Sequence, residues 1–245
     1  TTVTVKPGAT FALKLCTDKE DAQPEDRPWQ WSGVSGVLRN IASIALESEG
    51  SVRSRYLTLC RKNCQVYSEI SGDGDFELNA IPVAYEDRHY YYGACSFKGT
   101  VTMRGANAAL YFHQESPGDH DNAVVMVDYG RMSFQAASGG TTPPHVYIRS
   151  LTSAPGGTQI WIPRSQTLEI GESHGSWSAG GDGPANVSVL QIDKLVDGVV
   201  RASPTVGLKL LAYEAGMVGT QSFNCNYDAT LDLSAYTGPW PLPVD

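Results

Sequence analysis

The chain has 245 residues, 41% hydrophobic and 18% charged, so it contains enough apolar material for a core and too little charge for a disordered chain. The formal net charge is −8 and no block of five or six basic residues occurs, which excludes the usual electrostatic signature of a nucleic-acid binder. No run of 18 apolar residues is present, so no membrane span is expected.

The first 28 residues contain two short alternating stretches, residues 1–5 and 11–15, followed by a polar, proline-containing break. Alternation predicts strands, so we expect an N-terminal arm and a first strand here. In residues 33–46, apolar side chains recur every three or four positions, which predicts a short amphipathic helix. Gly33 and Gly36 weaken the start of that helix.

From Gly50 onward, short runs with the period-two alternation of strands follow one another, separated by Gly, Pro, Asn and Ser clusters. The expected strands are residues 52–59, 65–70, 97–103, 108–113, 124–127, 131–135, 145–151, 158–162, 167–170, 187–192, 206–213 and 221–226. Many short strands between turn signals predict an antiparallel sandwich or barrel. No fixed-period repeat is visible, which argues against a propeller or a solenoid.

Gly171, Ser173 and Gly175 match the G-x-S-x-G pattern of a nucleophile elbow, in which a strand turns sharply into a helix and exposes the Ser hydroxyl. Four of the nine residues 176–184 are Gly or Pro, and such a segment cannot nucleate that helix. A Gly-rich loop is therefore the favoured interpretation. A serine hydrolase that uses Ser173 is retained as the weaker alternative.

His113, Glu115, Asp119, His120 and Asp121 crowd one expected loop and are candidate metal ligands. Their spacing matches neither the compact pairs of zinc sites nor the pattern of cupin sites. We therefore favour a solvated loop and expect no metal or cofactor site there.

Asp73, Asp75 and Glu77 alternate after a glycine, and carboxylates in such a turn can hold calcium through oxygen ligands. The twelve-residue EF-hand pattern is incomplete, and a turn of this composition needs no ion. The sequence leaves open whether these three residues bind calcium.

The five cysteines, Cys16, Cys60, Cys64, Cys95 and Cys225, are odd in number and scattered, which favours synthesis in a reducing compartment. Cys60 and Cys64 lack a second pair at zinc-ribbon spacing, so they are expected to be unpaired thiols.

Tryptophans can act as sugar-stacking platforms, and Trp177 in its Gly-rich segment is the first candidate. A carbohydrate-binding β-sandwich is therefore the main alternative function, although aromatic residues in sandwiches more often belong to a core or an interface.

Three segments carry a family resemblance: residues 31–56, which contain a Gly50-Ser51-Val52-Arg53 turn, residues 160–163, and residues 208–216 followed by Gly238-Pro239. In this order they resemble the capsid proteins of picorna-like positive-strand RNA viruses. The resemblance implies an all-β, eight-stranded antiparallel jelly-roll sandwich with long loops and one or two short helices. It also implies an N-terminal arm in residues 1–28, a jelly-roll domain in residues 29–235 and an extended C-terminal tail in residues 236–245.

The same resemblance implies a structural, non-enzymatic subunit that packs with homologous capsid proteins into an icosahedral shell around the genome. Such a subunit is assembled in the host cytoplasm and located in the virion, with weak or no direct RNA contact and a host receptor as a further partner. A chain that begins at Thr1 is also expected of a polyprotein cleavage product.

Overall fold

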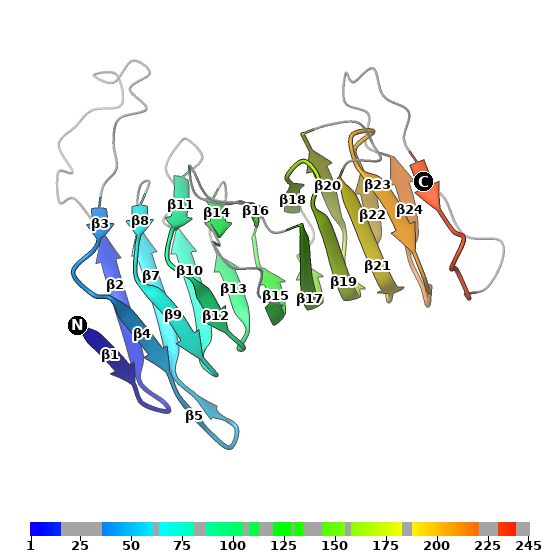
Figure 1. Ribbon diagram of the computed structural model, residues 1–245. Coiled ribbons are helices and arrows are strands. Elements are labelled where there is room, and N and C mark those ends of the chain that lie inside the picture. Colours follow the sequence, from blue (N-terminus) through cyan, green and yellow to red (C-terminus); the bar gives the residue numbers. More distant parts are fainter. Residues whose placement is uncertain are drawn as a thin grey trace, which may run out of the picture.

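A computed structural model describes residues 1–15, 36–60, 64–80, 87–104, 108–112, 120–128, 130–134, 144–154, 158–182, 188–220 and 230–238. Every regular element in these ranges is a β-strand and none is a helix (Figure 1). It follows that no helix able to cross a membrane occurs in this part of the chain.

Most strands in these ranges lie in three parallel sheets, named A, B and C here. Sheet A contains β1 (Thr2–Val5), β4 (Ser43–Leu46), β9 (Glu69–Gly72) and β12 (Cys95–Phe97). Sheet B contains β2 (Thr10–Leu15), β7 (Arg55–Cys60), β10 (Asp75–Ala80), β13 (Val101–Arg104), β15 (His120–Met126), β17 (His145–Ser153), β19 (Thr167–His174), β21 (Val189–Leu195), β23 (Gly207–Leu210) and β25 (Thr230–Asp232).

Sheet C contains β3 (Gly36–Leu38), β8 (Cys64–Val66), β11 (Asp87–Tyr91), β14 (Ala108–Phe112), β16 (Gly130–Ser133), β18 (Thr158–Ile162), β20 (Trp177–Gly181), β22 (Val199–Ala202) and β24 (Met217–Thr220). A small antiparallel hairpin pairs β5 (Ser48–Glu49) with β6 (Val52–Arg53).

The chain winds as a parallel β-solenoid. Up to β13 the chain passes in each turn through sheets A, B and C, and from β13 onward it alternates between sheets B and C. Each new strand lies beside the strand of the same sheet in the preceding turn. Figure 1 shows the result as a row of strands whose colour changes steadily from blue at the N-terminal end to red at the C-terminal end.

Alternate side chains of each strand point into the solenoid and stack on equivalent residues of the next turn. In sheet B, one inward column contains Phe11, Tyr56, Phe76, Val101 and Val124. The last four are at most 2% exposed. The Phe11 and Tyr56 rings stack at 5.9 Å and the Tyr56 and Phe76 rings at 5.2 Å, so aromatic packing adds to the burial of apolar surface.

Buried polar side chains satisfy backbone carbonyls where the chain leaves a strand. The amide of Asn122 donates to the carbonyls of Phe97 and Gly99 at 2.8 and 2.7 Å, and Gln166 donates to the carbonyl of Phe134 at 2.8 Å. Because an orphaned buried carbonyl is costly, these amides stabilise the corners of the solenoid.

The expectation of an all-β chain is confirmed, but the eight-stranded antiparallel jelly-roll sandwich is wrong, since sheets A, B and C are parallel. Period-two alternation reports only that one face of a strand is buried. It does not report the direction of the neighbouring strand, and a solenoid buries one face of each strand just as a sandwich does.

The predicted helix in residues 33–46 is also wrong: the described part of this segment forms β3 and β4. Ile44 and Leu46 are buried, whereas Ser43 and Ala45 are partly exposed, as expected of a strand. Two short strands separated by a break place apolar residues three or four positions apart, which imitates the helical period.

The argument against a solenoid fails because its turns differ in length. In sheet B, 18 residues separate Leu190 from its partner Leu208, and 27 separate Val124 from its partner Leu151. Connections of different length remove any fixed period although the strands stay in register. The proposed boundaries at residues 28 and 236 stay predictions.

Candidate ligand-binding face

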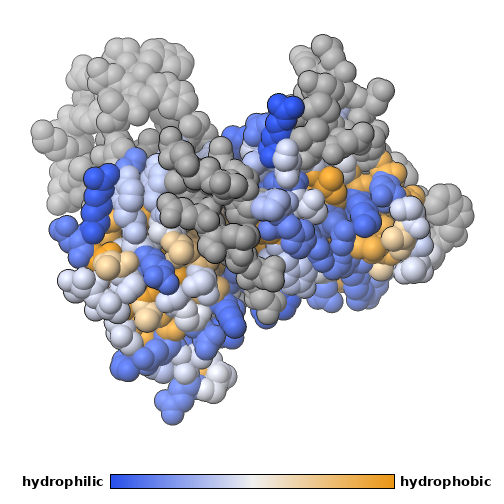
Figure 2. Space-filling model, viewed as in Figure 1, coloured by the Kyte–Doolittle hydropathy of each residue, from blue (hydrophilic) through white to orange (hydrophobic). Residues whose placement is uncertain are grey.

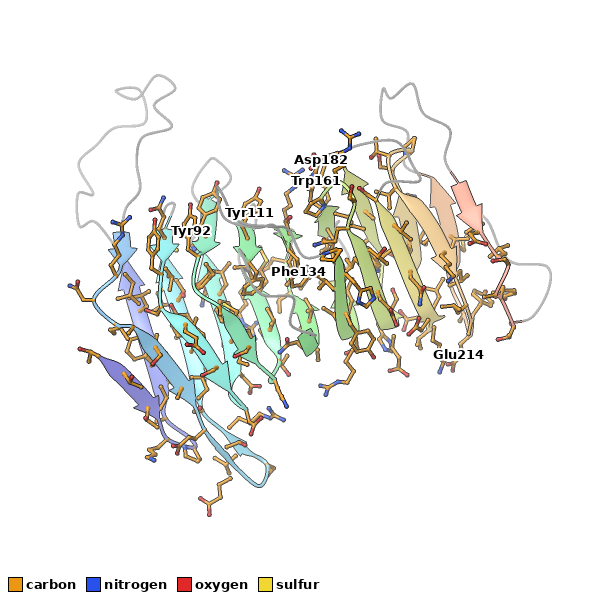
Figure 3. The ribbon with its side chains drawn as sticks, viewed as in Figure 1. Tyr92, Tyr111, Phe134, Trp161, Asp182 and Glu214 are labelled. Carbon is orange, nitrogen blue, oxygen red and sulfur yellow. The ribbon has the colours of Figure 1, made fainter. Side chains whose placement is uncertain are left out.

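The outer face of sheet C carries aromatic and arginine side chains over many consecutive turns. We call Arg39, Tyr67, Tyr90, Tyr92, Arg131, Trp161 and Arg201 the arginine–aromatic face. These residues lie on or directly after strands β3, β8, β11, β16, β18 and β22. Figure 3 shows Tyr92, Tyr111 and Trp161 following one another along the row of strands.

Tyrosines of successive turns stack at the N-terminal part of this face. The rings of Tyr67 and Tyr92 lie 4.7 Å apart and within 9° of parallel, and those of Tyr90 and Tyr111 lie 5.1 Å apart and within 17°. Tyr90 and Tyr92 also stack, at 6.1 Å, which joins the two pairs. Parallel in-register strands about 4.8 Å apart produce this stacking, because they place equivalent side chains directly above one another.

Arg39 covers the outer end of the tyrosine stack. Its guanidinium lies 4.3 Å from the centre of the Tyr67 ring, and its Nη2 donates to the Tyr67 Oη at 3.0 Å. Tyr67 is 37% exposed, so this end of the stack reaches solvent, whereas Tyr111 is buried. Burial of the Tyr92 hydroxyl, with lesser effects of Tyr67 and Tyr90, raises the pKa of Tyr92 above the ordinary value.

Trp161 and Arg131 form the second accessible part of the face. The guanidinium of Arg131 lies 4.5 Å from the centre of the Trp161 ring. On the next turn the partner of Trp161 is Gly180, and a Cβ there would approach two ring atoms of Trp161 at 2.8 Å. Because Gly180 has no side chain, the Trp161 indole fits beside it. The same indole makes a cation–π contact with the Arg131 guanidinium.

Arg131 and Arg201 belong to one outward column of sheet C, which runs through Gln159 and Ser178. All four side chains are partly exposed. Three steps of about 4.8 Å between neighbouring strands place the two arginines about 14 Å apart. Between them the column offers an amide and a hydroxyl, which are groups that hydrogen-bond uncharged partners.

The outer face of sheet B differs, because carboxylates occur there together with basic side chains. Glu77 pairs with Arg55 at 3.2 Å and with Arg104 at 3.1 Å, and Glu169 contacts the Nε2 of His145 at 2.8 Å. On the described outward positions of the sheet C strands no carboxylate occurs. The charge of this acidic chain is therefore unevenly distributed between the two sheets.

Asp193 on sheet B accepts a hydrogen bond from Gln191 at 2.9 Å and also interacts with Glu169. Partial burial, and then the neighbouring Glu169 carboxylate, raise the pKa of Asp193. Paired carboxyl groups can serve acid–base chemistry. Here His145 and Gln191 already bind these two carboxyl groups, so we assign the pair to the surface network of sheet B.

The residues of the G-x-S-x-G motif, the weaker alternative in the sequence analysis, do not form a nucleophile elbow. Gly171, Ser173 and His174 lie within the regular strand β19. The Ser173 side chain is fully buried, and its Oγ accepts a hydrogen bond from Trp177 Nε1 at 2.9 Å. Ser173 therefore lacks the exposed hydroxyl that a nucleophile elbow requires, and the absence of a following helix agrees with the sequence argument.

Trp177, the first candidate for a sugar platform, lies in the interior at 3% exposure. Its segment is strand β20 and not a loop, which corrects the expectation of a Gly-rich loop. Trp29, Trp31 and Trp240 lie outside the described residues.

The candidate calcium residues are engaged by protein groups. Asp75 Oδ1 accepts a hydrogen bond from the Thr100 amide at 2.8 Å, and Glu77 is held by its two arginines. Asp73 is exposed, and its backbone carbonyl accepts a hydrogen bond from Arg53. The carboxylates of Asp75 and Glu77 therefore have local structural roles.

Of the crowded acidic loop, His113, Glu115 and Asp119 lie outside the described residues, and His120 and Asp121 belong to β15. Across the described ranges, no group of three or more His, Cys, Asp or Glu is arranged to hold a metal ion. Cys64 and Cys95 are buried and form no disulfide.

No family model, curated protein or solved structure matches this chain. The candidate site therefore depends on the geometry alone. Sequence reasoning missed Tyr67, Tyr90, Tyr92 and Arg131 because they are far apart in sequence and meet only through the winding of the solenoid. The Tyr90-Tyr91-Tyr92 run was the one local signal available.

Proposed function

We propose that this chain is a carbohydrate-binding β-solenoid whose ligand lies on the arginine–aromatic face. The observation that carries the proposal is the row of aromatic and hydrogen-bonding side chains that follows sheet C over consecutive turns. Aromatic rings contact the apolar faces and edges of sugars, while Gln159, Ser178 and the tyrosine hydroxyls suit sugar hydroxyls.

The form of the site favours a polymer over a small sugar. Strands about 4.8 Å apart repeat the same kind of outward position along the solenoid, and a ligand with repeating units can use several of these positions at once. Figure 2 shows that apolar residues on the visible face of the molecule occur in separate groups among hydrophilic ones.

Binding to an array of neutral and acidic glycans tests the proposal. Tyr67→Ala and Trp161→Ala are each expected to weaken binding by about tenfold, because each removes an aromatic contact. Tyr147→Ala on the outer face of sheet B is the matched control and should bind as the unmodified chain does. Absence of binding across the array, or equal loss in all three variants, would refute the proposal.

The capsid function stays a prediction and is not our preferred one. Its main structural argument was the jelly roll, and a parallel solenoid removes that argument. Negative-stain microscopy of the native source material tests it, since icosahedral particles are what the resemblance implies. The non-enzymatic assignment, the virion location and the capsid partners likewise stay predictions.

A further inference from the structure

We infer that the ligand of the arginine–aromatic face is an acidic polysaccharide, in which carboxylate or sulfate groups are separated by stretches of sugar ring. This inference rests on the proposed carbohydrate-binding function and adds the chemical class of the carbohydrate.

The first argument is the charge of the face. The chain as a whole is acidic at −8, yet Arg39, Arg131 and Arg201 lie on the outer face of sheet C, where the described outward strand positions carry no carboxylate. The exposed carboxylate Asp182 lies just beyond the end of β20, at the rim of this face (Figure 3). Such segregation creates a local positive potential that attracts an anionic ligand in spite of the net charge.

The second argument is the way in which two of the arginines are held. Arg39 lies over Tyr67 at 4.3 Å and Arg131 over Trp161 at 4.5 Å. A ring under a guanidinium fixes its plane, and a fixed guanidinium loses less entropy when it forms the two parallel hydrogen bonds that a carboxylate or sulfate accepts. Arg131 and Arg201 also have other contacts.

The third argument is spacing. Arg131 and Arg201 are about 14 Å apart along the column, with the uncharged Gln159 and Ser178 between them. This order of charged, neutral, neutral and charged side chains suits a polymer whose acidic groups are separated by sugar hydroxyls. Phosphates of one duplex strand follow at about 3.4 Å along the helix axis, which is far denser than these arginines.

The test measures binding of the full chain to polygalacturonate, to neutral dextran and to single-stranded polyuridylate by isothermal titration calorimetry. We expect polygalacturonate to bind most tightly and to weaken as NaCl rises from about 50 to about 300 mM, because salt screens the arginines. Arg131→Gln and Arg201→Gln should each weaken polygalacturonate binding by about tenfold, since each removes a charge-assisted hydrogen bond. Arg149→Gln, which changes an exposed arginine on sheet B, should have no effect.

The outcomes separate the inference from the proposed function. Equal affinity for dextran and polygalacturonate, with both reduced by Trp161→Ala, would overturn the acidic class and leave carbohydrate binding intact. Tightest binding to polyuridylate would overturn the inference in favour of a nucleic-acid ligand. If neither polysaccharide binds, and the glycan array is also negative, both proposals fail.

Discussion

His89 is a titratable residue of the interior. It is fully buried on β11, with its Nδ1 3.1 Å from the Sγ of Cys64, and its Nε2 has no hydrogen-bond partner among the described residues. Burial lowers the pKa of His89 to about 4, because the imidazolium would lose its hydration. The solenoid therefore holds this residue in its neutral form at physiological pH.

This arrangement predicts a loss of stability in acid. Between pH 6.5 and about 4 the unfolded chain binds a proton at His89 and the folded chain does not. His89 should therefore contribute a fall of about 3 kcal/mol to the free energy of unfolding as the pH drops from about 7 to about 4. Urea denaturation at several pH values measures this fall, and His89→Leu should remove it.

The same pH dependence in His89→Leu as in the unmodified chain would contradict the assignment.

At the scale of elements, the corners between sheets B and C depend on glycines that stack from turn to turn. Gly198 has a φ of +84°, and a Cβ at this position would lie 1.9 Å from the carbonyl oxygen of Gly175 in the preceding turn. The carbonyl of Gly198 in turn accepts a hydrogen bond from the Met217 amide at 2.8 Å. A side chain at Gly198 would therefore separate two turns whose backbones must approach closely.

Gly198→Ala should lower the free energy of unfolding by about 3 kcal/mol or more, through left-handed backbone strain together with the clash. Gly50→Ala is a matched control, because Gly50 also has a positive φ of +60° but no atom lies within 4 Å of its added Cβ. It should cost about 1 kcal/mol, from strain alone. Chemical denaturation measures both values, and equal losses would show that the contact between turns is unimportant.

At the scale of the whole molecule, a solenoid is stabilised turn by turn, since each turn contacts mainly its neighbours. Strand β19 is hydrogen-bonded to β17 on one side and to β21 on the other. In contrast, β1 is an edge strand of sheet A and β25 is an edge strand of sheet B. The interior turns should consequently open less readily than the terminal ones.

Amide hydrogen exchange followed by mass spectrometry tests this expectation. Peptides from β17 and β19 should exchange slowest, and those from β1 and β25 fastest, because the terminal strands can separate without breaking the central turns. Uniform protection along the chain would instead indicate a single cooperative unit.

The amino-acid sequence by itself determined that strands dominate the chain and where many of them lie. Residues 158–162 were predicted as a strand and form β18, and residues 108–113 overlap β14. It also identified the weakness of the Ser173 motif, because four Gly or Pro residues in residues 176–184 exclude the helix that a nucleophile elbow needs. These conclusions depend on local sequence patterns, which can be read from neighbouring residues alone.

Only the tertiary structure decided that the strands are parallel, that residues 36–46 form strands, and that Tyr90 stacks on Tyr111 while Arg131 lies over Trp161. Alternation of buried and exposed residues is the same in parallel and antiparallel sheets, so the local sequence does not indicate strand direction. Because the turns differ in length, the sequence shows no fixed-period repeat. The spacing between Arg131 and Arg201 depends on how the turns stack. The candidate site therefore exists only once the chain has wound upon itself.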